Sequence, residues 1–252
     1  MKFPTTTAVF AALIAASQLA QAEIPVKPGD KVAFLGDSIT QAGQGSPGGY
    51  CQLVISGLAA NGVKTELIGA GISGHKSNDM LARLDRDVLD KKPQWMTLSC
   101  GVNDVWHGAN GVPLEDYKKN ITSIVDKAQT AGVKVVILTS TMIGEDQPNP
   151  NNQKLVAYND FLRTLAKEKK CRLADLNAEM QSALAEIAKS QPKPATGNHL
   201  TADGVHMNPA GNQMMATGVL KGLGLNAAEI AKATSAWRDA SNNQQKPAPG
   251  AK

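Results

Sequence analysis

Short apolar and β-branched runs alternate along this chain with longer segments of helical periodicity, and this alternation limits the fold more than any other feature. The clearest run is residues 133–138, within the sequence VKVVILTS. Strands that are apolar on both faces are typical of a parallel sheet covered by helices. The expected strands are residues 31–35, 65–68, 95–100, 133–138 and 171–175.

Helical segments fit between and after these strands. In residues 77–90, for example, Met80, Leu81, Leu84 and Val88 recur at helical spacing. The expected helices are residues 49–60, 77–90, 114–130, 152–168, 209–220 and 227–238. In a chain of 252 residues, this order predicts one domain of the α/β class. We expect a three-layer α/β/α sandwich around a doubly wound parallel sheet of about five strands.

The N-terminus has the pattern of a secretory signal peptide. Lys2 precedes a short apolar run at residues 8–16, and an A-x-A sequence ends at Ala22. The apolar run is shorter than the roughly 20 residues that a membrane-spanning helix needs. We therefore expect residues 1–22 to be removed and the protein to be exported, to the periplasm or the medium. An uncleaved amphipathic helix or membrane anchor is the alternative.

The remaining chain divides into a domain and a tail. We expect the folded domain over residues 23–239. Residues 240–252, with the sequence ASNNQQKPAPGAK, are polar and contain two prolines, which predicts a disordered tail. Residues 189–201 contain two prolines and a glycine and are expected to form a loop that leads into the functional site.

The basic residues are scattered rather than gathered in a stripe. The formal net charge is +4, and the largest lysine clusters are Lys91–Lys92, Lys118–Lys119 and Lys169–Lys170. A protein that binds nucleic acid usually has a denser basic surface with aromatic side chains nearby. This pattern favours solvated helix faces and ends over a nucleic-acid partner.

The three cysteines, Cys51, Cys100 and Cys171, are an odd number. At least one thiol is therefore unpaired within a single chain. The sequence does not place a disulfide between any two of them.

Polar and small residues follow the expected strands at the points where the strands end. Asp37 and Ser38 come after the first strand, Gly74 lies in the loop after the second, and Asn103 comes after the third. The sequence Asp-Gly-Val-His at 203–206 follows the fifth strand at a distance. Since ligands bind at the carboxyl ends of the strands in open α/β sheets, we expect these residues to meet at one edge.

These side chains suit acyl transfer by a serine nucleophile. The Ser38 hydroxyl needs a base to take its proton, and the imidazole of His206 is a suitable base near neutral pH. Asp203, three residues earlier, is expected to hold the other ring nitrogen of His206. The developing oxyanion needs donors, for which the backbone N–H groups of Ser38 and Gly74 and the side chain of Asn103 are candidates.

The four blocks GDSIT, GISG, GVND and DGVH, in this order, resemble those of the GDSL-type or SGNH hydrolases. That family is named for a catalytic serine, glycine, asparagine and histidine, one from each block. Residue by residue, the resemblance implies Ser38 as nucleophile, Gly74 and Asn103 as oxyanion donors, and Asp203 and His206 as the rest of a triad. It implies no cofactor.

The resemblance extends from residue 31 to about residue 220. It implies a flavodoxin-like sandwich with a parallel sheet of about five strands. The family includes lipases, lysophospholipases, thioesterases, arylesterases and carbohydrate O-acetylesterases. This chain departs from the family pattern at Ile39, where the family name has leucine, and at Gly69–Ala70, where many members carry an asparagine.

Three other functions compete with this interpretation. His199, Asp203 and His206, with His75 and His107 in nearby loops, suggest a metal-dependent hydrolase, but no H-E-x-x-H spacing is present. Proteins that only bind a ligand can also use this fold, although binding does not require serine, aspartate and histidine together.

A nucleotide site is the third alternative. Residues 43–48 match G-x-G-x-x-G, but the match starts eight residues after Leu35 instead of at the end of the strand. Pro47 also lacks an N–H group for a phosphate. We therefore expect this segment to form a rim of the functional site.

The substrate is less constrained than the chemistry. Trp106 and His107 closely follow Asn103, so we expect them to flank the substrate pocket together with Asp37. No long apolar lid segment of the kind used by lipases is present. The sequence favours short acyl groups such as acetyl esters on a carbohydrate. A lysophospholipase or lipase-like acylhydrolase, or an acyltransferase, remains the alternative on the same residues.

Overall fold

The computed structural model describes residues 24–190 and 197–244 of the chain. Its strands form one parallel sheet in the order β2-β1-β3-β4-β5. The strands are β1 (Lys31–Gly36), β2 (Glu66–Gly71), β3 (Trp95–Ser99), β4 (Lys134–Leu138) and β5 (Arg172–Ala174). This is the flavodoxin-like order, so the expected doubly wound sheet is confirmed.

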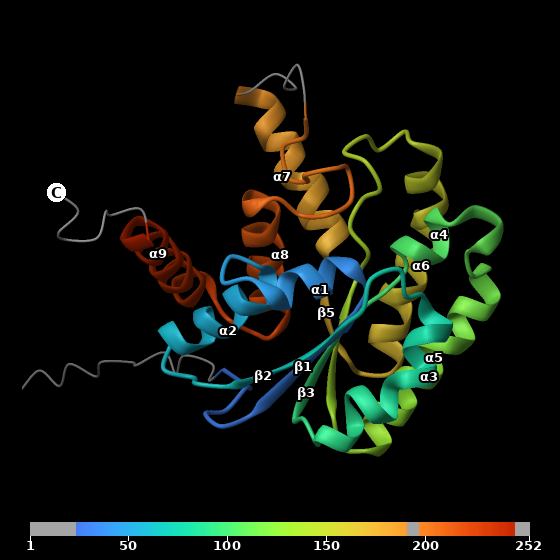
Figure 1. The fold of residues 1–252 in the computed structure, drawn as a ribbon, viewed down its shortest axis with the longest axis horizontal. Coiled ribbons are helices and arrows are strands. Elements are labelled where there is room, and N and C mark those ends of the chain that lie inside the picture. Colours follow the sequence, from blue (N-terminus) through green and yellow to red (C-terminus); the bar gives the residue numbers. More distant parts are fainter. Residues whose placement is uncertain (1–23, 191–196, 245–252) are drawn as a thin grey trace, which may run out of the picture.

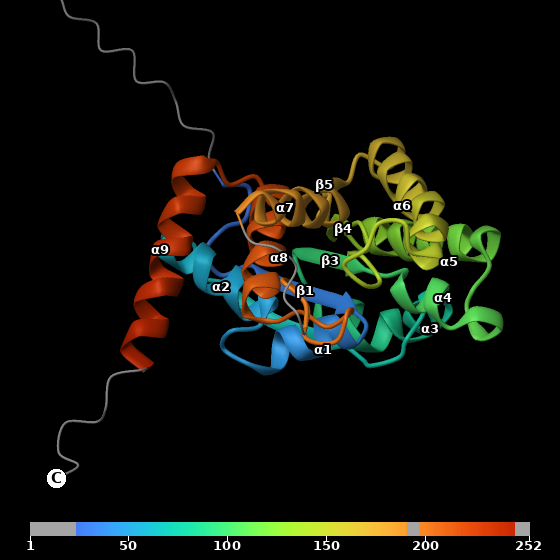
Figure 2. The ribbon, with the colours of Figure 1, turned by 90° about the horizontal axis from the view of Figure 1, so that it is seen from above.

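Helices cover both faces of the sheet and make it the middle of three layers (Figures 1 and 2). On one face lie α3, α5 and α6, with α4 beside them, and on the other lie α2 and α8, against which α9 and α7 pack. The helices are α1 (Ser38–Gly45), α2 (Tyr50–Ala60), α3 (Ser77–Asp87), α4 (Val102–Trp106), α5 (Leu114–Thr130), α6 (Pro150–Glu168), α7 (Leu176–Ser190), α8 (Pro209–Gly222) and α9 (Ala227–Gln244). Short 3-10 turns lie at Leu89–Lys91 and Gly108–Asn110.

The core is densest in the three middle strands. From Val32 to Gly36 in β1, throughout β3, and from Val135 to Leu138 in β4, every residue is buried. Apolar runs with no exposed face were the basis for expecting a parallel sheet, and here both of their faces are covered. The middle strands thus give a rigid support to the loops at their carboxyl ends.

The predicted bounds of the second strand are wrong at both ends, and those of the other strands shift by one residue. The second strand begins one residue later than expected and continues through Gly69, Ala70 and Gly71. These residues pair in register with Phe34, Leu35 and Gly36 of β1. Glycine weakens a strand on its own, so pairing with β1 decides the conformation there.

Three helices were not predicted. Helix α1 is rich in small and polar residues, and α4 is only five residues long, so neither shows a clear apolar periodicity. The buried residues of helix α7 are Leu176, Asn177 and Met180, all near its N-terminus, so the rest of the helix is only partly buried or exposed. It also takes in residues 189 and 190, which were expected to begin a loop.

The C-terminal helix is longer than expected. Helix α9 continues to Gln244, so residues 240–244 are helical and are not part of a disordered tail. Trp237 anchors the helix: its side chain is 4% exposed, and its Nε1 donates to the carbonyl oxygen of Leu53 on α2. The expected signal peptide at residues 1–22 and the remainder of the expected tail lie outside the described residues.

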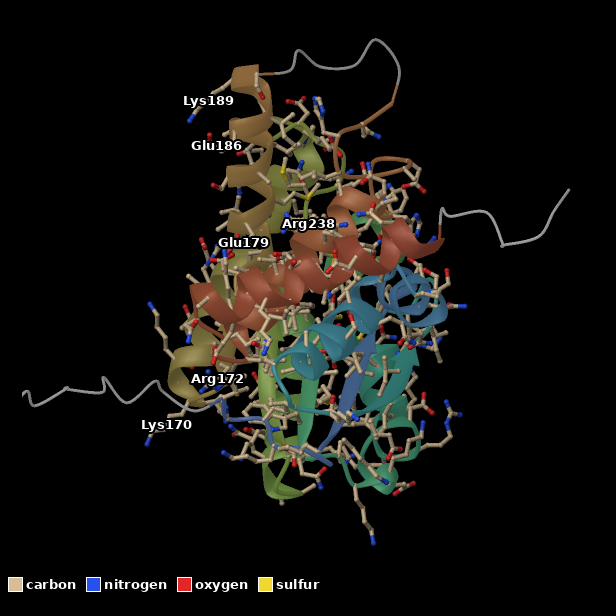
Figure 3. The ribbon with its side chains drawn as sticks, turned by 90° about the vertical axis from the view of Figure 1, so that its left-hand side faces the viewer. Lys170, Arg172, Glu179, Glu186, Lys189 and Arg238 are labelled. Atoms are coloured by element: carbon tan, nitrogen blue, oxygen red, sulfur yellow. The ribbon has the colours of Figure 1, made fainter. Side chains whose placement is uncertain are left out.

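The lysine clusters lie at helix faces and ends, as expected. Lys118 and Lys119 pair with acidic residues one turn earlier on α5, and Lys169 pairs with Asp126. Charges of both signs also lie along α7, where Figure 3 shows Glu179, Glu186 and Lys189 in succession. Surface pairs of this kind contribute about 0–1 kcal/mol each to stability.

The structure also gives the state of the cysteines and the character of the described helices. All three cysteines lie in the described part of the chain, and all are free thiols, with Cys51 and Cys100 buried and Cys171 partly buried. Over residues 24–190 and 197–244, no helix has the length and apolar character needed to cross a bilayer.

Candidate active site

The first side chain of the site lies where β1 ends and α1 begins. Ser38 is the first residue of α1, directly after Asp37, whose carboxylate caps the helix by accepting a hydrogen bond from the Ile39 N–H at 2.9 Å. This cap fixes the turn that brings the half-buried Ser38 to the carboxyl edge of the sheet. The sequence predicts that Asp37 flanks the substrate pocket. Asp37 is only 2% exposed, however, so it lies beneath the surface of the site, where it supports Ser38.

Ser38, His206 and Asp203 form a continuous chain of hydrogen bonds. The Ser38 Oγ lies 2.8 Å from His206 Nε2, and His206 Nδ1 lies 2.6 Å from Asp203 Oδ2. In this geometry the carboxylate accepts from Nδ1–H, which leaves Nε2 to accept the proton of the serine. The structure therefore brings Ser38 together with His206 and Asp203, which lie more than 160 residues later in the sequence.

Asp203 and His206 belong to one tight turn. Gly204 has a φ of +95°, a conformation that side chains with a Cβ rarely adopt. The turn directs the N–H groups of Val205 and His206 at Asp203 Oδ1, at 3.0 and 2.8 Å. Partial burial raises the pKa of Asp203, but the hydrogen bonds from the His206 ring and these two N–H groups outweigh it and lower the pKa to about 2. Asp203 is therefore an anion at neutral pH.

A short hairpin carries this turn. Thr201 and Met207 form an isolated antiparallel bridge, and the N–H of Ala202 donates to the carbonyl oxygen of His206 at 2.8 Å. In Figures 1 and 2 this segment, which precedes α8, lies over the end of the sheet where α1 begins.

Gly74 lies in the loop after β2, and Asn103 lies in α4, which begins shortly after β3. Gly74 is exposed and has a φ of +77°. Among the described residues, no acceptor is found for its N–H. Asn103 is 4% exposed and uses one hydrogen of its amide to donate to the carbonyl oxygen of His75 at 3.1 Å. The second amide hydrogen remains for another acceptor.

The histidines do not gather around a common centre. In the part of the chain that the structure describes, no group of three or more His, Cys, Asp or Glu side chains is arranged to hold a metal ion. Both ring nitrogens of His206 are engaged by Ser38 and Asp203, and Nδ1 of His75 accepts a hydrogen bond from Arg83. His199 contributes its backbone N–H to Glu145.

The glycine-rich segment at 43–48 also differs from a nucleotide site. Its first residues, Gly43 to Gly45, end α1. A phosphate-binding motif lies between a strand and the N-terminus of a helix, where N–H groups are free. This segment joins the end of α1 to the start of α2 and does not follow a strand.

The comparison with known proteins assigns the chain to a family. A model of the GDSL-like Lipase/Acylhydrolase family matches residues 34–214. The chain belongs to this family. It is accordingly a carboxylic ester hydrolase, and the expected SGNH resemblance is confirmed.

Relatives narrow the activity to a carbohydrate esterase or another acylhydrolase. An acetylxylan esterase from Geobacillus stearothermophilus is 28% identical in an alignment of 217 positions that covers 78% of this chain and 94% of the relative. The esterase TesA of Pseudomonas aeruginosa is 29% identical over 55% of this chain and 66% of its own length. The crystal structure of the acetyl xylan esterase AlAXEase has 37% sequence identity and a TM-score of 0.69, and covers 76% of this chain and 98% of that one.

Two charged residues under this family site were missed by the sequence analysis. Arg83 is 5% exposed and donates to the carbonyl oxygens of Gly36 and Ala70, at 2.9 and 2.8 Å, and to His75 Nδ1 at 3.0 Å. It thereby ties together the ends of β1 and β2 and the loop that holds Gly74. The available signal was a basic residue on the apolar face of α3, three residues after the buried Met80.

Asp104 is the second charged residue that the sequence analysis missed. It is 1% exposed and accepts hydrogen bonds from Ser77, from N at 3.0 Å and from Oγ at 2.6 Å. Burial raises the pKa of Asp104 despite these bonds. Burial also raises the pKa of Asp37 to about 6, with the neighbouring charge of Asp104 adding to the effect and the Ile39 N–H and His206 opposing it.

Trp106 and His107 lie at the end of α4. Trp106 is 45% exposed and His107 is also exposed, with their ring centroids 6.4 Å apart. Trp106 is three residues after Asn103 and so lies on the same side of this short helix. Their role in substrate binding stays a prediction.

The buried carboxyl of Asp37 predicts a pH-dependent stability. Its folded-state pKa of about 6 is above the ordinary value of 3.8, so the folded protein holds the proton longer than the unfolded chain does. The free energy of unfolding therefore falls as pH rises from about 4 to 6. Asp37→Asn removes this term and keeps a side-chain oxygen for the cap. Relative to the wild type, the variant should gain up to about 3 kcal/mol between pH 4 and 7.

Urea denaturation at several pH values measures this difference. Asp90→Asn, which changes an exposed aspartate, is the matched control and should leave the difference between variant and wild type constant. A difference for Asp37→Asn that does not change with pH would contradict the assignment.

Proposed function

We propose that this protein removes acetyl groups from a carbohydrate, with Ser38 as nucleophile, His206 as general base and Asp203 as the carboxylate that orients the imidazole. The observation that carries the proposal is the unbroken chain of hydrogen bonds from Asp203 through His206 to Ser38. Structures of the Geobacillus acetylxylan esterase include two catalytic mutants, in which a serine and an aspartate were replaced by alanine. These residue types agree with the roles proposed here.

The mechanism begins with attack by the Ser38 Oγ on the ester carbonyl carbon. His206 Nε2, 2.8 Å away, takes the hydroxyl proton as the new C–O bond forms. The tetrahedral intermediate then breaks its bond to the alcohol, which leaves with the proton from His206. Water, activated by the same nitrogen, cleaves the acyl-serine and releases the acid. A second alcohol in place of water would make the reaction a transfer.

Asp203 acts through the imidazole. Its carboxylate accepts the Nδ1 hydrogen at 2.6 Å, which selects the tautomer with a free Nε2 and stabilises the imidazolium formed during attack. Because its pKa is about 2, this support is present throughout the neutral pH range.

Three donors would stabilise the oxyanion. They are the backbone N–H groups of Ser38 and Gly74 and the second amide hydrogen of Asn103, which come from the carboxyl ends of β1, β2 and β3. Arg83 and the bond from Asn103 to His75 hold the Gly74 loop in place. Loss of one such donor typically costs about 10²- to 10³-fold in kcat.

Replacing Ser38 tests the nucleophile. Ser38→Ala should lower kcat/KM for p-nitrophenyl acetate by more than about 10⁴-fold, since Ser38 is the hydroxyl that contacts His206 Nε2 in the described part of the chain. Ser123→Ala, at an exposed position on α5, is the control and should retain full activity. A p-nitrophenyl ester series should show acetate as the preferred acyl group. Equal turnover by the wild type and Ser38→Ala would refute the mechanism, and preference for long chains would favour the lipase-like alternative.

The carbohydrate part of the proposal depends on Trp106. An exposed indole beside the oxyanion donor Asn103 offers a flat apolar surface on which a sugar ring can stack. Trp106→Ala should raise KM for an acetylated xylo-oligosaccharide by about tenfold and leave kcat/KM for p-nitrophenyl acetate unchanged, because the small ester does not reach the indole.

Val156→Ala is the matched control, since Val156 is the other large apolar side chain with substantial exposure among the described residues. It should change neither substrate's kinetics. If Trp106→Ala also left the oligosaccharide unaffected, Trp106 would have no part in the sugar site.

Export is the remaining part of the proposal, and it depends on the N-terminal sequence alone. The basic start, apolar run and A-x-A sequence ending at Ala22 predict a mature chain that begins at Glu23. N-terminal sequencing of the protein from the periplasm or medium of a bacterial host should show this end. A chain shortened by residues 2–22 should stay in the cytoplasm. An intact N-terminus in the cytoplasmic fraction would contradict export.

A further inference from the structure

A carboxylate in the loop after β4 receives hydrogen bonds from a segment more than 50 residues later. Glu145 Oε1 accepts from the N–H of Leu200 at 2.7 Å, from the N–H of Thr201 at 2.7 Å and from Thr201 Oγ1 at 2.9 Å. Its Oε2 accepts from the N–H of His199 at 2.7 Å. One side chain thus serves three successive backbone donors.

These three residues lead into the hairpin that carries Asp203 and His206. Thr201 is 2% exposed and forms the bridge to Met207 that closes the hairpin. The same loop also contacts the tip of the hairpin, because the N–H of Gly144 donates to the carbonyl oxygen of Gly204 at 2.6 Å. Residues 144 and 145 therefore hold both the base and the turn of the hairpin.

Glu145 is itself held by the first turn of α6. Asn152, 3% exposed, accepts from the N–H of Ile143 at 2.8 Å and donates to the carbonyl oxygens of Ile143 and Asp146, at 3.0 and 2.8 Å. The backbone on both sides of Glu145 is fixed by this one amide. The carboxylate is therefore attached to a rigid helix rather than to a free loop.

We propose that Glu145 is a positioning residue, which sets the place of His206 and Asp203 relative to Ser38. The inference rests on the proposed function of these three residues. Ser38 is fixed by β1 and α1, whereas His206 and Asp203 lie on a hairpin whose base is attached to Glu145. A displacement of the imidazole by about 1 Å would lengthen the 2.8 Å contact with Ser38 and can cost about 10²-fold in rate.

The role differs from ordinary stabilisation of a loop in what it predicts. Removing a carboxylate that only stabilised the fold would lower the unfolding temperature and leave the folded enzyme fully active. Removing a positioning carboxylate would lower kcat and leave KM nearly unchanged, because Gly74 and Asn103, which are proposed to bind the ester, lie on other segments of the chain. Its removal would also slow any reaction that needs an activated Ser38, including reactions without a sugar or an ester.

The test compares Glu145→Ala and Glu145→Gln with Asp146→Ala, an exposed acidic neighbour, as the matched control. For each variant, kcat and KM are measured with p-nitrophenyl acetate, and the rate of Ser38 modification is measured with phenylmethylsulfonyl fluoride. Glu145→Ala should lower kcat and the modification rate by about 10²-fold each, with KM changed less than about twofold. Glu145→Gln retains one acceptor oxygen, so its loss should be about tenfold. Asp146→Ala should behave as the wild type.

Thermal unfolding of each variant separates the outcomes. Full kcat in a Glu145→Ala variant with a lowered unfolding temperature would overturn the proposal and leave Glu145 a stabilising residue. Should Glu145→Ala fail to fold, Glu145→Gln carries the test, and wild-type kcat and modification rate in that variant would overturn the proposal. If the wild-type protein were not modified at Ser38, the proposed function would fail together with this inference, which distinguishes that case.

Discussion

The parallel pairing of β1 with β2 and with β3 is the constraint on which the rest of the structure depends. Since the three strands point the same way and are in register, their carboxyl ends deliver Ser38, Gly74 and Asn103 to one edge of the sheet. In the strand order observed here, β1 and β3 form the switch point at which helices leave in opposite directions. The divergence opens a surface that side chains can reach, while the buried strands beneath it keep the loop ends fixed.

The site combines a local unit with a distant one. Asp203 and His206 are three residues apart, and the turn at Gly204 arranges them with little help from the rest of the fold. Ser38 lies 168 residues from His206, so the contact between them depends on how the hairpin is attached to the sheet. Part of this attachment is apolar, through the buried Leu200 and Val205, and part is polar, through Glu145 and Gly144. Hydrogen bonds are directional, so the polar part sets orientation more sharply than apolar packing does.

Buried charged residues beneath the site also hold the reacting groups in place, at some cost in stability. Asp37, Asp104 and Arg83 are each almost fully buried. Arg83 and Asp104 each have several hydrogen-bond partners, whereas the Asp37 carboxylate accepts from the Ile39 N–H. Burying a charge is unfavourable unless such partners replace water. The raised pKa of Asp37 shows that the replacement is incomplete there. These residues fix the ends of β1, β2 and β3, where the reacting groups are attached.

The sequence by itself determined the sheet, most helices and the residues at the strand ends, because these depend on apolar periodicity and on motifs a few residues long. It also indicated the pairing of Asp203 with His206, which is local. Only the tertiary structure decided the strand conformation of Gly69–Gly71, the burial of Asp37 and the contacts of Arg83 and Glu145. Each of these depends on partners that are distant in the chain, and local sequence patterns do not predict such contacts.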